Sequence, residues 1–375
     1  MSMRKLGRIV HEICPTLDNP RKTEGAFALL KDGRIIFAFS NFVKGSGDDS
    51  EAEITAVYSS DDGESWSGER TLLKKRPEDT NIMSVSFLRL NDGALGMFYL
   101  CKTRLKTHMG CLVNLVRSYD EGETWSEPQV CTNDENYYVL NNDRVIRLKS
   151  GRVIFAVADH GAEKDTSDVS FFYSDDDCKS FVKSPARLVL PFTKTTTGLQ
   201  EPGLVELDGG RLWCFARTGH AYQFEAYSED GGITWSDVNP NPYFTSPNSP
   251  MLVKRIQDGR LLSVFNPIPN YNTRYYPENI ESAKKSPKYN MYHPWNCFSG
   301  RTPLVATTSK TDAYGFDLQP LALEDDPELT YCYPAIFPSK DYLLISYFIG
   351  NRSYGLNAGF DVYGITIKKI ELSEI

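Results

Sequence analysis

One eight-residue pattern recurs four times along the chain, at intervals of about 55 to 60 residues. The copies are Ser59–Trp66, Ser118–Trp125, Ser174–Phe181 and Ser228–Trp235, and three of them fit Ser-x-Asp-x-Gly-x-Ser/Thr-Trp. The third copy has Cys178 in place of Gly and Phe181 in place of Trp. A fixed period of this size is typical of folds in which small sheets are repeated around an axis. The repeat therefore constrains the architecture of the whole chain.

The chemistry of the pattern predicts a structural role. Asp and Ser or Thr side chains bind nearby backbone amides in turns, and Gly supplies a residue with positive φ. The aromatic residue is a large apolar group that can pack against a neighbouring pair of strands. We therefore interpret the acidic residues of the four copies as turn formers: Asp61, Asp120, Asp176 and Asp230.

A second signal counts the sheets independently. It consists of an apolar strand, a tight turn and a second apolar strand, with turns at Gly33, Gly93, Gly151, Gly210, Gly259 and Asp341. Asp-Gly or Ser-Gly between apolar runs is a strong hairpin signal. Six hairpins at this period predict an all-β fold, a six-bladed β-propeller with four antiparallel strands in each blade.

The eight-residue pattern resembles the Asp box, or BNR repeat, of the sialidase (neuraminidase) superfamily, whose propellers also have six blades. The resemblance covers nearly the whole chain, so residues 1–375 are expected to form a single domain. Strands near Leu6–Ile13 and Asp361–Leu372 are expected to pair and close the ring. The spacing between the last two turns is longer than the others, and a loop over about 266–300 is expected above the mouth of the channel.

Composition excludes several classes of partner. The net charge is -8 and no stripe of Lys and Arg stands out, which argues against nucleic acid but still allows an acidic ligand in a locally basic pocket. No apolar stretch is long enough to span a membrane. The eight Cys and five His residues show no metal-site spacing, so no metal and no cofactor is expected. The amino terminus has no apolar signal segment, which favours a cytoplasmic protein, or a secreted one if a leader was removed.

The resemblance implies three catalytic residues. Sialidases use a tyrosine nucleophile, a glutamate that assists it, and an aspartate that serves as acid and base on a loop. Glu201 and Tyr333 resemble the glutamate and the nucleophile, and Asp49 resembles the acid/base. Tyr331 lies beside Tyr333 on the same strand and remains an alternative, as Asp48 and Glu51 do for Asp49.

The resemblance also implies a clamp of three arginines for the carboxylate of a sugar. Arg217 follows Glu201, and Arg301 precedes Tyr333, at spacings that resemble those of the family, and Arg21 resembles the first arginine. Lys22 fits the position of Arg21 equally well. Four further polar residues on the inner strands are expected to bind substrate: Glu24, Asn142, Asp143 and Arg144.

Two departures from the family indicate a divergent pocket. The family has a glutamate that braces the first arginine, but the corresponding stretch Leu344–Gly350 contains no acid, and Glu24 is the candidate replacement. Arg21-Lys22-Thr23 stands where sialidases commonly have Arg-Ile-Pro. The pocket could therefore accept a related acidic sugar, such as a ketodeoxy acid.

These residues predict an exo-acting glycoside hydrolase that releases a terminal sialic acid or related acidic keto sugar from a glycoconjugate. A carboxylate is best bound by several guanidinium groups. A neutral phenol can attack an anomeric carbon that bears a carboxylate without charge repulsion. The alternatives are a propeller that binds carbohydrate without hydrolysing it, and a protein-interaction propeller, which the inward polar residues disfavour.

Overall fold

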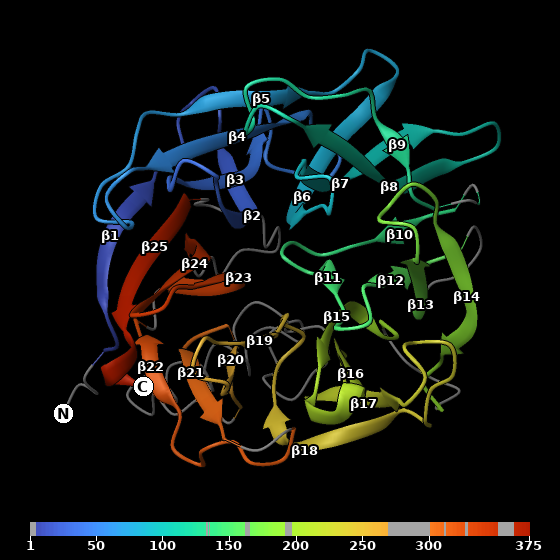
Figure 1. The fold of residues 1–375 in the computed structure, drawn as a ribbon, viewed down its shortest axis with the longest axis vertical. Helices are drawn as coiled ribbons and strands as arrows, with labels where there is room; N and C mark the ends of the chain where they lie inside the picture. Colours follow the sequence, from blue (N-terminus) through green and yellow to red (C-terminus); the bar gives the residue numbers. More distant parts are fainter. Residues whose placement is uncertain are drawn as a thin grey trace, which may run out of the picture.

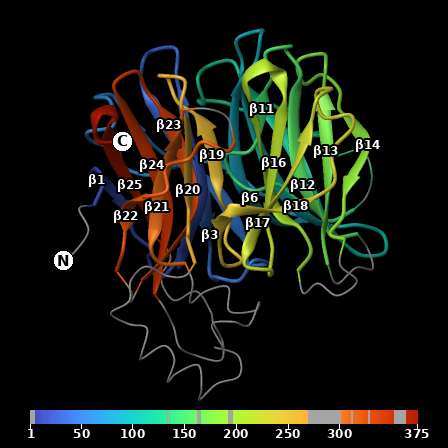
Figure 2. The ribbon, with the colours of Figure 1, turned by 90° about the horizontal axis from the view of Figure 1, so that it is seen from below.

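The chain forms a ring of six blades around a central axis (Figure 1). The computed structural model describes residues 5–132, 134, 136–161, 166–191, 197–268, 301–310, 313–326, 329–351 and 364–375. Seen from the side, the strands of the blades stand roughly upright (Figure 2). Within the described residues, the fold is the six-bladed all-β propeller that the hairpin count predicts.

Each blade is an antiparallel sheet, numbered here in chain order from the channel outward. Blade 1 has β2 (Arg21–Leu29), β3 (Ile35–Phe42), β4 (Ala52–Ser59) and β5 (Arg70–Lys74). Blade 2 has β6 (Asp79–Arg89), β7 (Leu95–Arg104), β8 (Met109–Ser118) and β9 (Gln129–Val130). Blade 3 has β10 (Tyr138–Val139), β11 (Ile146–Arg147), β12 (Val153–Asp159), β13 (Asp168–Ser174) and β14 (Val182–Leu188). Because β10 and β11 both pair with β12, the inner strand of blade 3 is split in two.

The remaining blades complete the ring. Blade 4 has β15 (Gln200–Glu206), β16 (Leu212–Arg217), β17 (Tyr222–Ser228) and β18 (Asn239–Thr245), with the 3-10 turn η1 (Asp208–Gly210) in its first hairpin. Blade 5 has β19 (Leu252–Arg255), β20 (Leu261–Phe265), β21 (Leu304–Ser309) and β22 (Leu321–Glu324). Blade 6 has β23 (Leu329–Pro338), β24 (Tyr342–Asn351), β25 (Gly364–Glu371) and β1 (Arg8–Ile13), and the short η4 (Leu372–Glu374) follows β25.

The two ends of the chain close the ring within one sheet. Strand β1 pairs antiparallel with β25, from Arg8 opposite Lys369 to Ile13 opposite Ile365. This confirms the pairing expected of the terminal strands. Closure in this way ties the first strand of the chain to the last blade, so the ring cannot open without breaking backbone hydrogen bonds.

The hydrophobic core is divided into six layers, one between each pair of neighbouring blades. Between blades 2 and 3, for example, the rings of Phe98, Phe155 and Phe181 pack with centroids 5.8 to 6.2 Å apart. Buried aromatic pairs of this kind stabilise by about 0.5–1.5 kcal/mol beyond the area they bury. The blades are therefore held face to face, and the channel is left to polar side chains.

The repeated eight-residue patterns form the turns that their chemistry predicts. Asp61 Oδ1 accepts hydrogen bonds from Ser59 Oγ at 2.8 Å and from the Ser65 N–H at 2.9 Å, while Ser59 Oγ accepts the Gly63 N–H at 2.9 Å. Hydrogen bonds from Ser65 and Ser59 lower the pKa of Asp61 to about 2. Trp66 packs into the core layer between blades 6 and 1. The same bonds recur at Asp120, Asp176 and Asp230.

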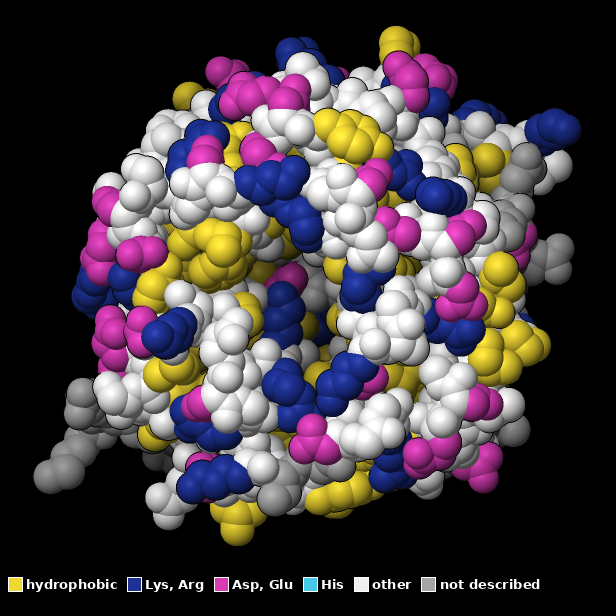
Figure 3. Space-filling model, in the orientation of Figure 1, with side chains coloured by type: hydrophobic (Ala, Val, Ile, Leu, Met, Phe, Trp, Pro, Cys, Tyr) yellow, Lys and Arg dark blue, Asp and Glu magenta, His cyan; other side chains and the backbone are white. Residues whose placement is uncertain are grey.

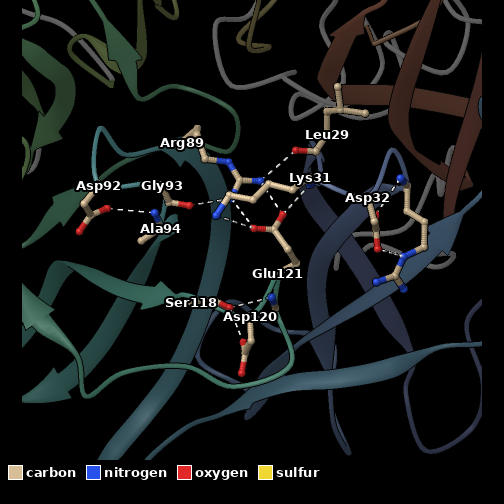
Figure 4. A network of polar contacts seen from close by, with 12 residues as sticks. Leu29, Lys31, Asp32, Arg89, Asp92, Gly93, Ala94, Ser118, Asp120 and Glu121 are labelled. Carbon is tan, nitrogen blue, oxygen red and sulfur yellow. Dashed lines mark hydrogen bonds and ion pairs between the residues drawn. The ribbon is translucent and has the colours of Figure 1, made fainter.

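Arg89 joins blades 1 and 2 near the hairpin turns (Figure 4). Arg89 of blade 2 donates to Glu121 through both terminal nitrogens at 2.8 Å, to the Gly93 carbonyl at 3.2 Å, and to the Leu29 carbonyl of blade 1 at 3.1 Å. Glu121 also accepts the Lys31 N–H of blade 1 at 2.8 Å. The corresponding contacts between blades 2 and 3 are made by Arg147, Gly151 and Asp177.

Lys and Arg side chains gather around a hollow at the centre of the face seen in Figure 3. The net charge of -8 therefore does not describe the channel locally. Among the described residues, no helix has the length and apolar character needed to cross a membrane. The loop predicted over about 266–300 lies almost entirely outside the described residues.

Candidate functional site

Four inner strands bulge at the same level of the ring. In β2, β6, β15 and β23, two residues of the inner strand face one residue of the next strand. The first residue of each bulge has a positive φ: Glu24 (55°), Ser84 (59°), Glu201 (46°) and Tyr333 (53°). Asp143 (58°) occupies the corresponding position in the gap between β10 and β11. Since a bulge redirects a side chain, the four bulges, together with the gap at Asp143, place one residue of positive φ in each of five blades.

None of these five residues is Gly. A residue with a side chain costs on the order of 1–3 kcal/mol in the left-handed region, and it persists there only where its surroundings impose it. Such strain is concentrated at functional sites. The level of the bulges is therefore the candidate active site, and it contains Glu201 and Tyr333 from the sequence analysis.

The tyrosine and glutamate of the site meet across the channel. The Tyr333 hydroxyl of blade 6 donates to Glu201 Oε1 of blade 4 at 3.2 Å. Arg217 Nη1 lies 2.6 Å from Glu201 Oε2, and Arg217 Nη2 donates to Gln200 Oε1 at 3.2 Å. The close pair is a charge contact without hydrogen-bond geometry, and both of its atoms lack a hydrogen-bond partner among the described residues. Tyr333, Glu201 and Arg217 thus form one buried cluster with unused hydrogen-bonding capacity.

Arg301 lies against the same tyrosine. It is 2% exposed, and its guanidinium carbon is 5.5 Å from the centre of the Tyr333 ring. Its terminal nitrogens donate to Cys332 Sγ at 3.2 Å and to the Asn248 carbonyl at 3.0 Å. These contacts fix the direction of a planar group that can bind a carboxylate with two parallel hydrogen bonds.

Arg21 enters the site from the start of β2 and is also buried. Its Nη1 lies 2.5 Å from Asp48 Oδ1, and its Nη2 lies 4.0 Å from Glu24 Oε1. Glu24 in turn accepts a hydrogen bond of 2.5 Å from Ser84 Oγ. Glu24 and Ser84 are thus joined bulge to bulge, and Glu24 lies beside the arginine that it was expected to brace.

The segment between β3 and β4 carries the two candidate acids, and they have different surroundings. Asp48 contacts Arg21, whereas Asp49 contacts Lys102 Nζ at 3.1 Å and leaves 83% of its side chain exposed. Lys102 also donates to the Asp48 carbonyl at 2.6 Å, and Asn81 donates to the Ser50 carbonyl. The segment is therefore held on the site by three side chains of blades 1 and 2.

The three polar residues of the split inner strand do not share one role. Asn142 and Asp143 bind backbone groups of other blades. Arg144 is 2% exposed, and its Nε and Nη1 lack hydrogen-bond partners among the described residues. Its guanidinium lies over Phe215, 5.5 Å from the ring centre, and a Cβ at Gly203 would come within 2.7 Å of Nη1. Gly203 is therefore required for Arg144 to reach this position.

Burial dominates the electrostatics of the site. It raises the pKa of Tyr333 well above its usual value, and the neighbouring charge of Glu201 adds to the effect. It raises the pKa of Glu24 to about 7, although Arg21 opposes it. It lowers the pKa of Arg144 to about 10. Burial also acts to raise the pKa of Asp48, but the charge and hydrogen bond of Arg21, together with the charges of Lys102 and Arg217, hold that pKa below its usual value.

The structure separates the alternatives that the sequence left open at two positions. Tyr331 packs in the core layer between blades 5 and 6, edge-on to Tyr347, and is 1% exposed. Lys22 Nζ pairs with Glu69 Oε1 at 2.5 Å on blade 1. Neither side chain has a contact with the Tyr333–Glu201 pair.

Four residues of the site were absent from the sequence-based set. They are Ser84, Lys102, Gln200 and Asn248, which contact the predicted residues through side chains or a carbonyl group. Ser84 holds the position in blade 2 that Glu24 holds in blade 1, so the equivalent bulge could have identified it. The positive φ that marks this position is not visible in the sequence. Among the described residues, no group of three or more His, Cys, Asp or Glu side chains is placed to hold a metal ion.

The chain matches a known protein family over most of its length. Residues 33–345 match the family described as BNR repeat-like domain. A comparison with curated proteins finds no match.

Solved structures share the fold at low identity. A protein of unknown function from Dyadobacter fermentans is similar with a TM-score of 0.69 and 17% identity, over 97% of this chain and 99% of that one. The NanB sialidase of Streptococcus pneumoniae is similar with a TM-score of 0.69 and 14% identity, over 100% and 72%. The intramolecular trans-sialidase of Ruminococcus gnavus, in complex with oseltamivir carboxylate, gives a TM-score of 0.69 and 14% identity, over 97% of each chain.

Proposed function

The chain belongs to the BNR repeat-like domain family and is a divergent sialidase-like propeller, and from this premise we propose that it is an exo-acting glycoside hydrolase. The proposed reaction releases a terminal sialic acid, or a related acidic keto sugar, from a glycoconjugate. The observation that carries the proposal is the Tyr333–Glu201 hydrogen bond of 3.2 Å, with Arg217 on the glutamate and Arg301 against the tyrosine ring.

The arginines account for binding of an acidic sugar. Arg21, Arg217 and Arg301 come from blades 1, 4 and 5, and all three belong to the buried cluster around the bulges. Guanidinium groups remain charged and bind carboxylates in a planar, bidentate manner. A ligand carboxylate would supply acceptors for Nε and Nη1 of Arg217, which lack hydrogen-bond partners among the described residues. Unsatisfied buried donors of this kind call for a ligand or a functional role.

The tyrosine and glutamate account for attack on the sugar. The raised pKa of Tyr333 keeps its phenol neutral until a base removes the proton, and Glu201 is within hydrogen-bond reach to do so. As the Tyr333 oxygen bonds to the anomeric carbon, the glycosidic bond breaks and the leaving oxygen takes a proton from an acid. Water then displaces Tyr333 and gives a proton to the acid/base carboxylate, while Glu201 returns its proton to the phenol.

The segment between β3 and β4 supplies the acid. The resemblance pointed to Asp49, whose carboxylate is exposed and contacts Lys102. The side chain of Asp48 is 63% exposed and pairs with Arg21, and a ligand carboxylate bound to Arg21 would displace it. We assign the acid/base function to this pair and give Asp48 the direct role, because it touches the arginine that the substrate would occupy.

A propeller that binds an acidic sugar without hydrolysing it is the second candidate. It is favoured by the Arg21–Asp48 pair, in which Asp48 has a lowered pKa and is a poor proton donor in the absence of ligand. Turnover separates the two candidates.

The experiment is incubation of the protein with a panel of fluorogenic α-ketosides that includes sialic and ketodeoxy acids. We expect release of the fluorophore, and product analysis by NMR should give the α-anomer first if Tyr333 forms a covalent intermediate. Because one structural neighbour is an intramolecular trans-sialidase, the products are also examined for an anhydro sugar. Binding of these ketosides without release of fluorophore would support the second candidate, and neither binding nor release would overturn both.

A further inference from the structure

We propose that Asn142 and Asp143 are positioning residues. Their hydrogen bonds fix the bulges of blades 1, 2 and 6 relative to one another. This inference rests on the proposed function. It gives a role to Asn142 and Asp143, which lie where the inner strand of blade 3 is interrupted between β10 and β11. It differs from the sequence-based expectation that both residues bind substrate.

The first observation is where the Asn142 amide donates. Its Nδ2 is 2.8 Å from the Gly25 carbonyl and 3.3 Å from the Pro334 carbonyl. Gly25 follows Glu24 in the bulge of β2, and Pro334 follows Tyr333 in the bulge of β23. One side-chain amide therefore joins the equivalent carbonyl groups of blades 1 and 6.

The second observation is that the backbone of Asp143 reaches the same position in blade 2. Its N–H donates to the Val85 carbonyl at 2.9 Å, and Val85 follows Ser84 in the bulge of β6. The Arg144 N–H donates to Ser86 Oγ at 2.9 Å. Asn142 and Asp143 thus form hydrogen bonds with three bulges. In each bulge the acceptor is the carbonyl group of the residue that follows the one with positive φ.

The third observation is the carboxylate of Asp143. Its Oδ2 accepts the Ile336 N–H of β23 at 3.0 Å, and its Oδ1 accepts from Lys254 Nζ at 2.6 Å. Lys254 also donates to the Ile336 carbonyl at 2.9 Å. Asp143 and Lys254 therefore clamp Ile336, three residues beyond Tyr333, from blades 3 and 5.

These contacts explain how the strain at Tyr333 is maintained. The register of β23 against β24 breaks between Cys332 and Ala335, so the backbone around Tyr333 and Pro334 lacks its regular ladder partners. Asn142 binds the Pro334 carbonyl within the bulge, and Asp143 binds the Ile336 N–H just after it. The Tyr333 hydroxyl then meets Glu201, which a small rotation of the bulge would prevent. Displacement of a reacting group by about 1 Å can reduce a rate about 10²-fold.

The chain offers a matched control for a buried asparagine. Asn241 is 2% exposed on β18, the outermost strand of blade 4, and like Asn142 it donates through its amide nitrogen to another strand. Its Nδ2 donates to Glu225 at 2.7 Å, and its Oδ1 accepts the Tyr243 N–H at 2.9 Å. Asn241→Ala therefore removes a comparable buried network at a distance from the bulges.

The test compares Asn142→Ala with Asn241→Ala in the full chain. We expect both variants to lose thermal stability, whereas only Asn142→Ala loses kcat by about 10²-fold with KM changed by less than about threefold. Crystal structures of wild type and Asn142→Ala should show a longer distance from the Tyr333 hydroxyl to Glu201 in the variant. Equal kcat in the two variants, or an unchanged distance in the Asn142→Ala crystal, would overturn the proposal.

Asp143→Asn serves if Asn142→Ala does not fold. It keeps an acceptor for the Ile336 N–H and removes only the charge that pairs with Lys254, so we expect a smaller loss of kcat, about tenfold. A variant with wild-type kcat and an unmoved Tyr333 would contradict the inference. The distance measured in crystals needs no turnover, so it tests the inference even if the wild-type protein hydrolyses none of the ketosides.

Discussion

Asp48 forms an ion pair with the buried Arg21: Asp48 Oδ1 lies 2.5 Å from Arg21 Nη1, and Arg21 is 2% exposed. A ligand carboxylate that binds Arg21 must compete with this contact. Once displaced, Asp48 would lose the interaction that holds its pKa below the usual value, and it would become a better proton donor. Ligand binding and activation of the acid are thereby coupled in one pair of residues.

The first prediction distinguishes the two neighbouring acids. Asp48→Asn should lower kcat by on the order of 10²-fold for substrates with poor leaving groups, and by much less for aryl ketosides, which leave without protonation. The same variant should bind an unreactive acidic sugar more tightly, because Arg21 is no longer paired with a charge. Asp49→Asn is the control and should change kcat less than threefold. A dead Asp49→Asn and an active Asp48→Asn would return the role to Asp49.

The second prediction concerns the nucleophile. Tyr333→Phe keeps the ring against Arg301 and removes the hydroxyl that binds Glu201, so turnover should fall by about 10³-fold or more while affinity for an acidic sugar stays within a few fold. Steady-state kinetics and calorimetric titration measure the two quantities. Tyr331→Phe is the control, because Tyr331 is a core residue, and it should affect stability only. Full activity of both variants would exclude a tyrosine nucleophile and favour direct attack by water.

The six-bladed fold could be predicted from the sequence because its signals are repeated and each lies within a short stretch of the chain. The bonds of Asp61 with Ser59 and Ser65 reach no further than four positions along the chain, and every counted hairpin turn except the one at Asp341 contains an Asp-Gly or Ser-Gly pair. Local turn chemistry of this kind needs no knowledge of the rest of the chain. The blade count followed from it directly.

The site was only partly accessible because its geometry depends on distant blades. Glu201 and Tyr333 could be named from spacing, but their positive φ values could not, since neither residue type favours that region. Asn142 was assigned to substrate, yet its amide binds two carbonyl groups on blades 1 and 6. Such contacts join residues more than a hundred positions apart, and no sequence pattern signals them.

The third prediction separates stability from function. Glu121→Ala removes the bidentate partner of Arg89 and the acceptor for the Lys31 N–H, and it leaves a partly buried guanidinium with fewer partners (Figure 4). We expect a loss of about 1–2 kcal/mol in the free energy of unfolding. The turnover number should stay unchanged, because the clasp lies at the hairpin turns and not at the bulges. Urea denaturation measures the first quantity, and a drop in kcat for the folded variant would refute the separation.

The last prediction concerns pH. The pKa of Glu24 is raised from 4.5 to about 7, so between these values the folded protein keeps a proton that the unfolded chain has lost. The stability associated with this group is therefore greatest below pH 4.5, falls as the pH rises to about 7, and is constant above that. Since one pKa unit corresponds to about 1.4 kcal/mol, the fall is on the order of 3 kcal/mol. Glu24→Gln cannot ionise, so the difference in unfolding free energy between the variant and wild type should grow in favour of the variant from pH 5 to pH 8. Urea denaturation at these two pH values measures the difference, and a difference that does not change with pH would show that Glu24 is already ionised at pH 5.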